Sequence, residues 1–524
     1  MAPSVRLDGD SLTLAHVVAV ARDGAGADVA PRAWKRVDAS RKVVEDLVAR
    51  REVAYGITTG FGEFAHVTID PAQVRQLQRN LLMSHAVGVG EPLPREVVRA
   101  MMLIRANTLV KGHSGVRRAV VERLLDLLRL DLVPVVPSRG SVGSSGDLAP
   151  LAHMALPLIG LGKLDPGTPP AGAQAARGST AVPAVPAAQA LRAAGLKPLE
   201  LEAKEGLALI NGTQMMSAIG CLAVSDALGL LEDAQAVAGM SVEALMGSVQ
   251  PFAARVHELR PHAGQAAVAA NLRALTAGSA IVQSHEGCDR VQDAYSLRCI
   301  PQVLGPCREV LRAAADALAI EINSVTDNPL VFPDGAIVSQ GNFHGEVLAF
   351  HLDFVAIALS EMASLSERRT ERLVNPALSE GLKPFLVDKG GLNSGFMIAQ
   401  YVAAALVSEN KVQSHPASVD SIPTSANQED HNSMGSIAAL KLGRVLENAR
   451  NVVAIEALCA AQALDFKRPL KAGKGSAAAH AAIRRQVPRL EADRILSDDV
   501  AAIAAMLASG QLRAAVRGAG VKVL

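Results

Sequence analysis

The stretch from Gly140 to Pro150, GSVGSSGDLAP, decides what kind of protein this sequence encodes. It places two hydroxyl side chains, Ser144 and Ser145, between glycines and follows them with an acid, Asp147. Its glycine spacing does not match the G-x-G-x-x-G of dinucleotide-binding proteins, and no Gly-Lys-Ser/Thr ends it as in a P-loop. It also lacks the final glycine of the G-x-S-x-G nucleophile elbow. A flexible turn before a helix, with Ser145 or Asp147 as the N-cap, is the plain structural alternative.

The order Ser144-Ser145-Gly146 also permits a reaction of the chain with itself. A glycine amide can reach the carbonyl two residues earlier in a tight bend, because glycine has no Cβ to obstruct it. Here the Gly146 nitrogen would attack the Ser144 carbonyl carbon, and Ser145 would lose its hydroxyl as water. The product would be an electrophilic imidazolone with a methylidene group, made from the chain alone. This hypothesis explains the residue types better than a plain turn does.

The composition indicates a large, helical protein. Hydrophobic residues make up 49 % of the 524 residues and aromatic residues only 3 %. The chain is too long for one ordinary core, so we expect two or three packed units or one long helical body. Its richness in alanine and leucine favours helices. The 52 basic and 51 acidic residues give a net charge of +1, so we expect no nucleic-acid partner.

The cysteines and the N-terminus indicate the compartment. An odd number of cysteines without a CxxC pair favours reduced thiols, as in the cytoplasm. The sequence MAPSVRLDGDSLTL carries acids where a signal peptide needs a basic and then an apolar start. No run of about 18 uncharged apolar residues occurs, so we expect no membrane span. The five cysteines are Cys221, Cys288, Cys299, Cys307 and Cys459.

The hydrophobic pattern predicts a mainly α fold built as a bundle of long helices. Helical patterns cover residues 71–85, 205–248, 304–323, 346–373 and 390–411. In 346–373 the apolar side chains recur at i, i+4, i+7, i+11 and i+14, which predicts one buried stripe on a long helix. That stripe consists of Leu348, Leu352, Val355, Leu359 and Met362.

We expect two domains. Residues 1–200 would form a smaller, mixed domain that carries the Gly140–Pro150 stretch, and residues 201–524 would form the long-helix bundle. Within the first domain, residues 55–65, YGITTGFGEFA, are typical of a loop. Residues 162–183 are rich in proline and glycine, which indicates a surface excursion.

The sequence GSVGSSGDLAPLAHMALPLIG strongly resembles the histidine and aromatic amino-acid ammonia-lyases. The resemblance runs from about residue 50 to about residue 435, and we expect it to cover the whole chain. It implies a 4-methylidene-imidazol-5-one (MIO) group formed from Ser144-Ser145-Gly146, without an external cofactor. Family members usually carry Ala-Ser-Gly, but the first residue contributes only its backbone carbonyl, so Ser144 should still cyclise. The resemblance also implies a helical homotetramer whose active sites draw residues from three subunits.

Several further residues match the family's active site. Tyr55 matches the tyrosine of its mobile loop and is a candidate base, although the family commonly has Asn at the position of Thr58. Tyr295 and Arg298 lie three residues apart, on one face if helical, with Gln292 on the same side. Arg298 offers a fork suited to a substrate carboxylate, and Tyr295 could relay protons. A packed loop tyrosine and a surface arginine are the structural alternatives.

Two more matches concern the wall of the pocket. Asn211, in LALINGTQ, would hydrogen-bond the ring carbonyl or the bound amine. Phe343, in GNFHGE, would lie beside the pocket. An Asn-Gly turn and a core phenylalanine are the structural alternatives.

The residues at two positions favour histidine as the substrate. His85 follows Ser84 as in lyases that act on histidine, and Gln428-Glu429 begins a Gln-Glu-Asp-His string. An imidazole has one donor and one acceptor nitrogen, which His85 and Glu429 can both satisfy. A benzene ring would leave Glu429 buried and unpaired, at a cost of roughly a few kcal/mol. The resemblance therefore implies elimination of ammonia from L-histidine to give trans-urocanate.

Two rival functions remain open at the level of sequence. A tyrosine or phenylalanine lyase, or an aminomutase, would use the same prosthetic group. A helical structural protein could keep the fold without the chemistry. No HExxH motif and no Cys/His ligand spacing occur, so the sequence predicts no metal site.

Overall fold

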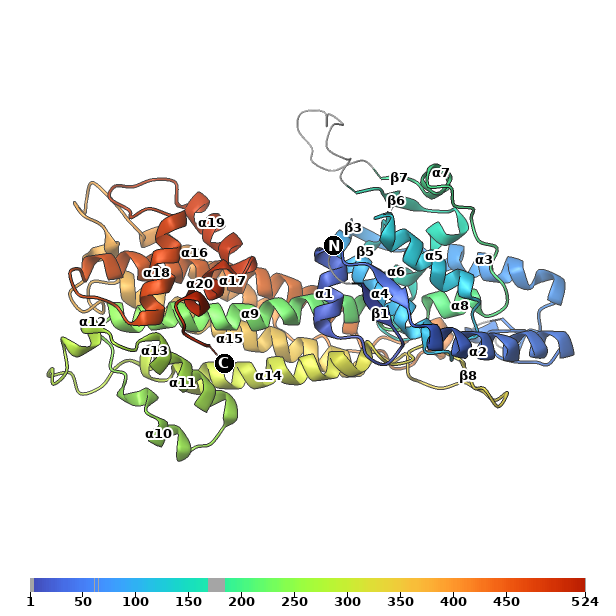
Figure 1. The fold of residues 1–524 in the computed structure, drawn as a ribbon, viewed down its shortest axis with the longest axis horizontal. Helices are drawn as coiled ribbons and strands as arrows, with labels where there is room; N and C mark the ends of the chain where they lie inside the picture. Colours follow the sequence, from blue (N-terminus) through green and yellow to red (C-terminus); the bar gives the residue numbers. More distant parts are fainter. Residues whose placement is uncertain (1–3, 61, 65, 168–183, 524) are drawn as a thin grey trace. The chain divides into compact units, whose positions relative to one another are not determined.

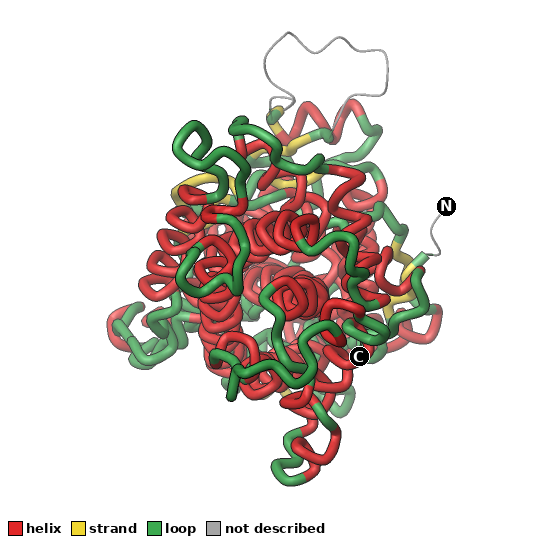
Figure 2. The backbone as a smooth tube through the Cα atoms, turned by 90° about the vertical axis from the view of Figure 1, so that its left-hand side faces the viewer, coloured by secondary structure: helices red, strands yellow, loops and turns green. Residues whose placement is uncertain are grey.

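A computed structural model describes residues 4–60, 62–64, 66–167 and 184–523 (Figure 1). Helices make up 60 % of it, which confirms the mainly α fold predicted from the sequence. Figure 2 shows helices in red along most of the trace, with strands in yellow only as short pieces.

The helices range from single turns to the long rods predicted from the hydrophobic pattern. The α-helices are α1 (Leu14–Arg22), α2 (Pro31–Arg50), α3 (Val74–His85), α4 (Arg95–Val110), α5 (Arg118–Arg129), α6 (Leu148–Ala155), α7 (Ala187–Ala193), α8 (Glu205–Ile210), α9 (Gln214–Ala244), α10 (Ala254–Glu258), α11 (Ala263–Leu275), α12 (Ala280–Gln283), α13 (Tyr295–Arg298), α14 (Ile300–Glu321), α15 (Glu346–Val374), α16 (Met397–Gln413), α17 (Gly435–Phe466), α18 (Lys474–Gln486), α19 (Leu496–Ala508) and α20 (Gln511–Gly518). The 3₁₀ helices are η1 (Gly62–Phe64), η2 (Pro71–Gln73), η3 (Leu156–Ile159), η4 (Gln250–Phe252), η5 (Pro384–Leu386) and η6 (Ser425–Asn427).

The strands form small, separate sheets. β1 and β2 pair in parallel, β3 pairs antiparallel with β5, β6 lies between β4 and β7, and β8 pairs with β9. The pairing of β3 with β5 matters for the site, because β3 follows α3 closely and β5 ends one residue before Gly140. The strands are β1 (Val5–Leu7), β2 (Ala27–Val29), β3 (Val89–Pro92), β4 (Val133–Pro134), β5 (Pro137–Arg139), β6 (Lys163–Asp165), β7 (Val185–Pro186), β8 (Leu330–Val331) and β9 (Ile337–Val338).

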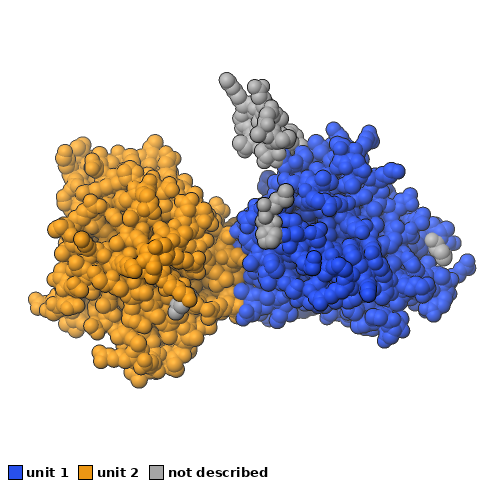
Figure 3. All heavy atoms as spheres, in the orientation of Figure 1, with its two compact units in different colours: residues 1–222, 315–352, 416–440 blue, residues 223–314, 353–415, 441–524 orange. Residues whose placement is uncertain are grey.

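The chain divides into two compact units, each made of three segments (Figure 3). The first unit holds residues 1–222, 315–352 and 416–440, and the second holds residues 223–314, 353–415 and 441–524. Four of the five boundaries fall inside the long helices α9, α14, α15 and α17, and the fifth, between residues 415 and 416, follows α16. Our sequence-based division of the chain at residue 200 stays a prediction.

The first unit is centred on α4. This helix is buried from Val97 to Val110 and packs against α1, α2 and α5, as expected of a helix that is apolar on most of its circumference. Beside it, α3, α6 and α8 pack against one another. These three helices position much of the site, because His85 ends α3, Asp147 precedes α6 and Asn211 follows α8.

In the second unit, long helices are joined through a buried ionic cluster. Glu456 of α17 is fully buried and accepts two hydrogen bonds from Arg369 of α15. The hydroxyls of Ser241 (α9) and Ser366 (α15) also donate to this carboxylate. A buried carboxylate with this many partners is well satisfied, and removing its cation would be strongly destabilising. Elsewhere in this unit α18 packs against α11, α19 and α20.

The stripe predicted for residues 346–373 is confirmed, since each of its five residues is 0–1 % exposed in α15. Two helices, α9 and α15, are long and apolar enough to cross a membrane by length and composition, and the bent pair α19–α20 would be a third. Within the structure 78 % of the apolar window of α9 and 56 % of that of α15 are buried. Burial against protein accounts for much of this hydrophobicity.

Two predicted segments differ from expectation or are described only in part. The helix predicted for 205–248 is interrupted between α8 and α9, because Asn211 is extended and Gly212 has a φ of +139°. Of the excursion predicted for 162–183, residues 163–165 form β6 and pair with β4 and β7. Residues 168–183 lie outside the described residues.

Candidate active site

The Ser144-Ser145-Gly146 turn is fixed by backbone contact with Gly212. Gly146 has a φ of +74°, and a Cβ on it would lie 2.1 Å from the Gly212 carbonyl oxygen. The Gly212 nitrogen donates to the Ser145 carbonyl over 3.2 Å, and the Asp147 nitrogen donates to the Gly212 carbonyl over 2.7 Å. Both the positive φ and the close approach of Gly212 require a glycine at this position. A backbone of this kind suits the tight bend that cyclisation requires.

Asp147 holds this turn to the start of α9. It lies at the N-cap position of α6 but makes no side-chain cap there, so the plain helix-cap interpretation is wrong for this residue. Its Oδ2 accepts the amides of Met215 and Met216 over 2.9 and 3.0 Å, and its Oδ1 accepts the Ser141 hydroxyl over 3.1 Å. Complete burial raises the pKa of Asp147 to about 6, against the lowering effect of these bonds and of Arg105.

The residues that lead into the turn are held by the start of α17. The Ser433 hydroxyl donates to the Gly143 carbonyl over 2.9 Å, and the Ser436 hydroxyl donates to the Ser141 carbonyl over 2.6 Å. A segment almost 300 residues away in the sequence therefore fixes the backbone on the N-terminal side of the two serines.

Arg105 of α4 supports the strand-like link between α8 and α9. It is fully buried and donates to the carbonyls of Ala208 and Asn211 over 3.1 and 2.8 Å and to Oε1 of Gln214. Burial lowers its pKa to about 10, and two nearby carboxylates oppose this shift. Arg105 was not among the site residues predicted from the sequence. The signal that could have indicated it is an arginine within an otherwise apolar helical pattern. Asn211 is 4 % exposed, and its Oδ1 has no hydrogen-bond partner among the described residues.

Glu429 lies directly beside the two serines. Its Oε1 accepts the Ser145 hydroxyl over 2.7 Å, and its Oε2 accepts the Ser144 hydroxyl over 2.8 Å. Thr424 donates to Oε2 as well, over 2.7 Å, and the Thr424 and Glu429 backbones form a short antiparallel bridge. Thr424 was missed by the sequence analysis because no motif marks it. The side chain of Ser145 therefore points to Glu429 and does not cap a helix.

His85 lies at the end of α3 and close to the same carboxylate. Its Nδ1 lies 3.0 Å from the Ser84 hydroxyl. Burial lowers the pKa of His85, while the Leu81 carbonyl and the charge of Glu429 act in the opposite direction. The structure thus brings together the two residues that the sequence analysis assigned to the substrate ring.

The loop that carries Tyr55 packs beside the segment that leads to Glu429. The Tyr55 hydroxyl oxygen accepts the Gly62 amide over 3.4 Å, and η1 packs against η6. A Cβ on Gly62 would lie 2.8 Å from the Ser425 hydroxyl. Thr58, which differs from the family's usual Asn, donates to the Glu52 carbonyl over 2.8 Å and closes the turn.

Phe343 lies on the segment that leads into α15, and Gln428 lies on the segment that carries Glu429. Phe343 is half-buried, three residues before the start of α15, and Gln428 is exposed immediately before Glu429. Both belong to the first unit, together with Tyr55, His85, the Ser144–Gly146 turn, Asn211 and Glu429.

Gln292, Tyr295 and Arg298 belong to the second unit. The Tyr295 ring is 71 % exposed, and the Arg298 guanidinium lies 4.7 Å from its centroid. Arg298 Nε is buried without a hydrogen-bond partner among the described residues. The prediction that Gln292 shares their helix face is wrong, because α13 begins at Tyr295 and Gln292 precedes it in an irregular segment.

A separate hollow of about 600 Å³ opens on the first unit. Several of its charged walls pair with one another, as Arg75 does with Glu202 and Arg41 with Glu45. None of the site residues lines it. Its lining consists of Arg41, Glu45, Val48, Ala49, Ala72, Val74, Arg75, Arg117, Glu202 and Ala203.

Residues 12–485 match the family described as aromatic amino acid lyase, and the chain belongs to this family. It is accordingly a carbon–nitrogen lyase. A histidine ammonia-lyase of Koribacter versatilis is 54 % identical over 98 % of this chain and 99 % of its own length. A histidine ammonia-lyase of Myxococcus xanthus is 52 % identical over 99 % of both chains.

Solved structures of related enzymes share the fold over nearly the whole chain. Histidine ammonia-lyase from Trypanosoma cruzi has a TM-score of 0.90 at 44 % identity, over 98 % of this chain and 95 % of that one. Tyrosine aminomutase from Streptomyces globisporus has a TM-score of 0.92 at 40 % identity, over all of both chains. The fold alone therefore does not separate the two reactions.

The prosthetic group of this family, MIO, fits the residues of this turn. It forms autocatalytically from the chain, so its source is Ser144-Ser145-Gly146. Gly146 has the positive φ that a tight bend uses, and Ser145 is the residue whose hydroxyl would be lost. Asn211 Oδ1, adjacent to the Gly212 that bonds Ser145, is a buried acceptor without a partner among the described residues, and an amine bound to such a group would donate to it.

Proposed function

We propose that this chain eliminates ammonia from L-histidine and releases trans-urocanate. The observation that carries this proposal is the position of Glu429. Its carboxylate accepts hydrogen bonds from both serines of the turn, and its negative charge acts to raise the pKa of His85. A charged acceptor and an imidazole beside the reactive turn suit a substrate ring that both donates and accepts hydrogen bonds.

Formation of the prosthetic group opens one oxygen of Glu429. Oε2 keeps its bonds from Ser144 and Thr424, but the only described partner of Oε1 is the hydroxyl that Ser145 loses. Oε1 is then available to accept the N–H of the substrate imidazole. The lowered pKa of His85 favours the neutral ring, which can offer one donor and one acceptor nitrogen. A phenyl ring would satisfy neither group, at a cost of about 1–3 kcal/mol for each unpaired partner.

The remaining residues bind and orient the substrate. MIO supplies an electrophile that activates the α-amino group for departure as ammonia. Arg298 would hold the substrate carboxylate through its guanidinium fork, and Asn211 would hydrogen-bond the amine or the ring carbonyl. A tyrosine, Tyr55 or Tyr295, would take the β-proton. Phe343 and Gln428 would close the pocket around the ring.

We further propose that the working form is a homotetramer with shared active sites. The support is that Tyr295 and Arg298 lie in a different compact unit from the serine turn, with Tyr295 largely exposed. A neighbouring copy could then supply them to the turn of the first. The enzyme would act in the cytoplasm, with L-histidine as its substrate and neither nucleic acid nor membrane as a partner.

Ultraviolet absorbance tests the reaction directly, because each substrate would become a conjugated acrylate. Purified protein is mixed with L-histidine, L-tyrosine or L-phenylalanine in parallel, and the absorbance of the expected product is followed. We expect a rise with L-histidine alone. A rise only with L-tyrosine or L-phenylalanine would keep the chemistry and overturn the assignment of His85 and Glu429.

The variant Ser145→Ala separates the chemistry from the fold. It should retain the native assembly by size-exclusion chromatography while turnover is abolished, because alanine has no hydroxyl to lose. Intact-mass measurement should show the wild-type chain two waters lighter than its sequence, and the variant not. Substantial activity in Ser145→Ala would end the proposal of an MIO-dependent reaction.

A further inference from the structure

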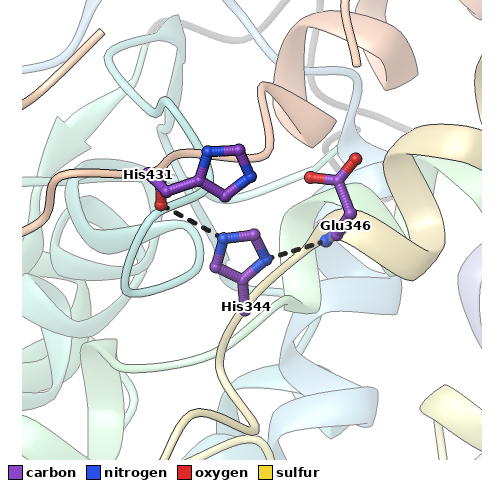
Figure 4. Close-up of side chains that lie close together, drawn as sticks. All are labelled: His344, Glu346 and His431. Carbon is purple, nitrogen blue, oxygen red and sulfur yellow. Dashed lines mark hydrogen bonds between the residues drawn. The ribbon is translucent and has the colours of Figure 1, made fainter. Parts of the chain in front are cut away.

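We propose that His344, Glu346 and His431 form a binding site for a divalent transition-metal ion such as Zn²⁺ (Figure 4). One potential ligand atom from each residue lies within 4.8 Å of the other two. The sequence predicts no such site, because His344 and His431 are 87 residues apart and follow no ligand spacing. The fold of the first unit brings them together.

The three side chains come from two segments that meet beside the start of α15. His344 lies in the turn before this helix, Glu346 is its first residue, and His431 lies on the segment that leads into α17. The two imidazole rings stack with centroids 5.7 Å apart and planes 8° apart. Two rings and a carboxylate therefore face one small volume, as Figure 4 shows.

The hydrogen bonds of His344 leave one of its nitrogens suited to a metal. The Glu346 amide donates to Nδ1 over 3.3 Å, so Nδ1 carries the lone pair. Nε2 then carries the proton and donates to the His431 carbonyl over 3.2 Å. Metal-binding histidines commonly donate their second N–H to a carbonyl in this way, which fixes the tautomer and the ring. The long Nδ1 contact is weak enough for a metal to replace.

Glu346 supplies the negative charge. Its Oε2 is buried and has no hydrogen-bond partner among the described residues. A buried carboxylate oxygen without a partner is unfavourable unless another group satisfies it. The helix amides at the start of α15 favour this charge, but they leave Oε2 unpaired. A bound cation would satisfy it.

The ligand types select among metals. Two imidazoles and one carboxylate suit Zn²⁺ and similar ions, whereas Mg²⁺ and Ca²⁺ prefer oxygen ligands throughout. In a tetrahedral Zn²⁺ site neighbouring ligand atoms are about 3.4 Å apart, as bond lengths near 2.1 Å require. The ligand atoms, which lie within 4.8 Å of one another, would have to move closer together around a bound ion. Three protein ligands leave a fourth position for water.

The site would join two segments that carry proposed active-site residues. Phe343 immediately precedes His344, and Glu429 lies two residues before His431. An ion shared by these segments would stabilise the folded chain against unfolding. The inference does not depend on the proposed reaction, since binding can be measured without any substrate.

The experiment titrates Zn²⁺ into the full-length, untagged protein after removal of metals with a chelator. Isothermal calorimetry gives the stoichiometry and affinity, and Co²⁺ absorbance reports the ligand geometry. We expect one ion per chain and, on Zn²⁺ addition, a higher unfolding midpoint. Glu346→Gln and His431→Asn, measured separately, should each weaken binding at least tenfold and abolish the rise in midpoint.

Two control variants address other metal-binding groups. His351→Ala removes a histidine of α15 whose Nδ1 donates to the Val347 carbonyl, and Cys288→Ser removes an exposed thiol. Both should bind Zn²⁺ as the wild type does. Unchanged affinity in Glu346→Gln and His431→Asn, loss of binding in Cys288→Ser, or no binding in the wild type would each overturn the proposal. Circular dichroism verifies the fold of every variant, so that lost binding is not lost structure.

Discussion

The Ser144 hydroxyl donates to Oε2 of Glu429 over 2.8 Å. This bond connects the residue where the chain departs from the family's usual alanine to the residue we assign to the substrate ring. Cyclisation uses only the backbone carbonyl of Ser144, so its side chain is available to position the carboxylate. The departure at this position therefore concerns substrate binding more than formation of the electrophile.

Replacing Ser144 by alanine should leave MIO formation intact. Thr424 would still hold Oε2 of Glu429, so we expect KM for L-histidine to rise by up to roughly tenfold, corresponding to about 1.5 kcal/mol for a bond to a charged group. The kcat should change little. Intact mass reports cyclisation, and steady-state kinetics report KM and kcat. An uncyclised variant would show that the Ser144 side chain takes part in maturation.

Replacing Glu429 by glutamine should weaken histidine turnover strongly. The donors Ser144 and Thr424 would occupy the single amide oxygen and turn the NH₂ group toward the imidazole N–H. We expect kcat/KM for L-histidine to fall by about 100-fold. The exposed neighbour Asp430 offers a matched control, and Asp430→Asn should behave as the wild type does. Equal losses in the two variants would contradict a specific role for Glu429.

Asp147 should make stability fall as pH rises through its folded pKa. The pKa is raised from 3.8 to about 6 by burial, so the folded state binds the proton more tightly than the unfolded state does. The favourable contribution is complete below pH 3.8 and is lost by about pH 6 to 7. In Asp147→Asn this dependence disappears, and relative to the wild type the variant should gain roughly 2 kcal/mol between pH 4 and 7.

Unfolding midpoints of both proteins across this range measure the gap between them. The difference between the two midpoints isolates Asp147, because the other titratable groups are the same in the wild type and the variant. A gap that stays constant from pH 4 to 7 would contradict the raised pKa of Asp147.

Arg105→Met should impair maturation as well as stability. It removes the donors to Ala208, Asn211 and Gln214 and leaves their buried oxygens unpaired, at a cost of about 3–5 kcal/mol. Because the link at Gly212 would loosen, the fraction of chains with two waters lost should fall. Arg99→Met is the control, since Arg99 is also buried but bonds Val20 and Asp131. If both variants matured equally well, Arg105 would be only a structural residue.

Shared active sites predict complementation between inactive variants. Ser145→Ala and Arg298→Gln should each be inactive alone, because one lacks the electrophile and the other the carboxylate ligand. When the two chains are co-expressed and mix randomly, about a quarter of the sites would receive both intact residues from different subunits. The measured activity should approach that fraction of wild type. If verified mixed tetramers recovered no activity, Ser145 and Arg298 of each site would have to come from the same chain.

The sequence predicted the long helices and the reactive turn because their signals are local. The stripe from Leu348 to Met362 has helical spacing, and the Ser-Ser-Gly order restricts what the turn can do. The family resemblance added His85 and Glu429, which the fold places close together.

Other contacts depend on segments that are distant in the sequence. Thr424 reaches Glu429 through a local bridge without a motif, and Arg105 acts through carbonyls more than a hundred residues away. The helix predicted for 205–248 ran across Asn211 and Gly212 because the apolar pattern resumes beyond them at Met215, although an Asn-Gly turn was the stated alternative. Gln292 was placed on a helix face because spacing alone does not mark the start of a short helix.

The hydrogen bond from Ser145 to Glu429 also sets an order of events in the life of the chain. Before dehydration the Ser145 hydroxyl bonds Oε1 of Glu429, the oxygen that we assign to the substrate imidazole, so in a newly folded copy an imidazole would share this oxygen with a hydroxyl. Loss of that hydroxyl creates the electrophile and vacates the acceptor in one event. Unmatured copies would therefore bind histidine more weakly than mature enzyme does.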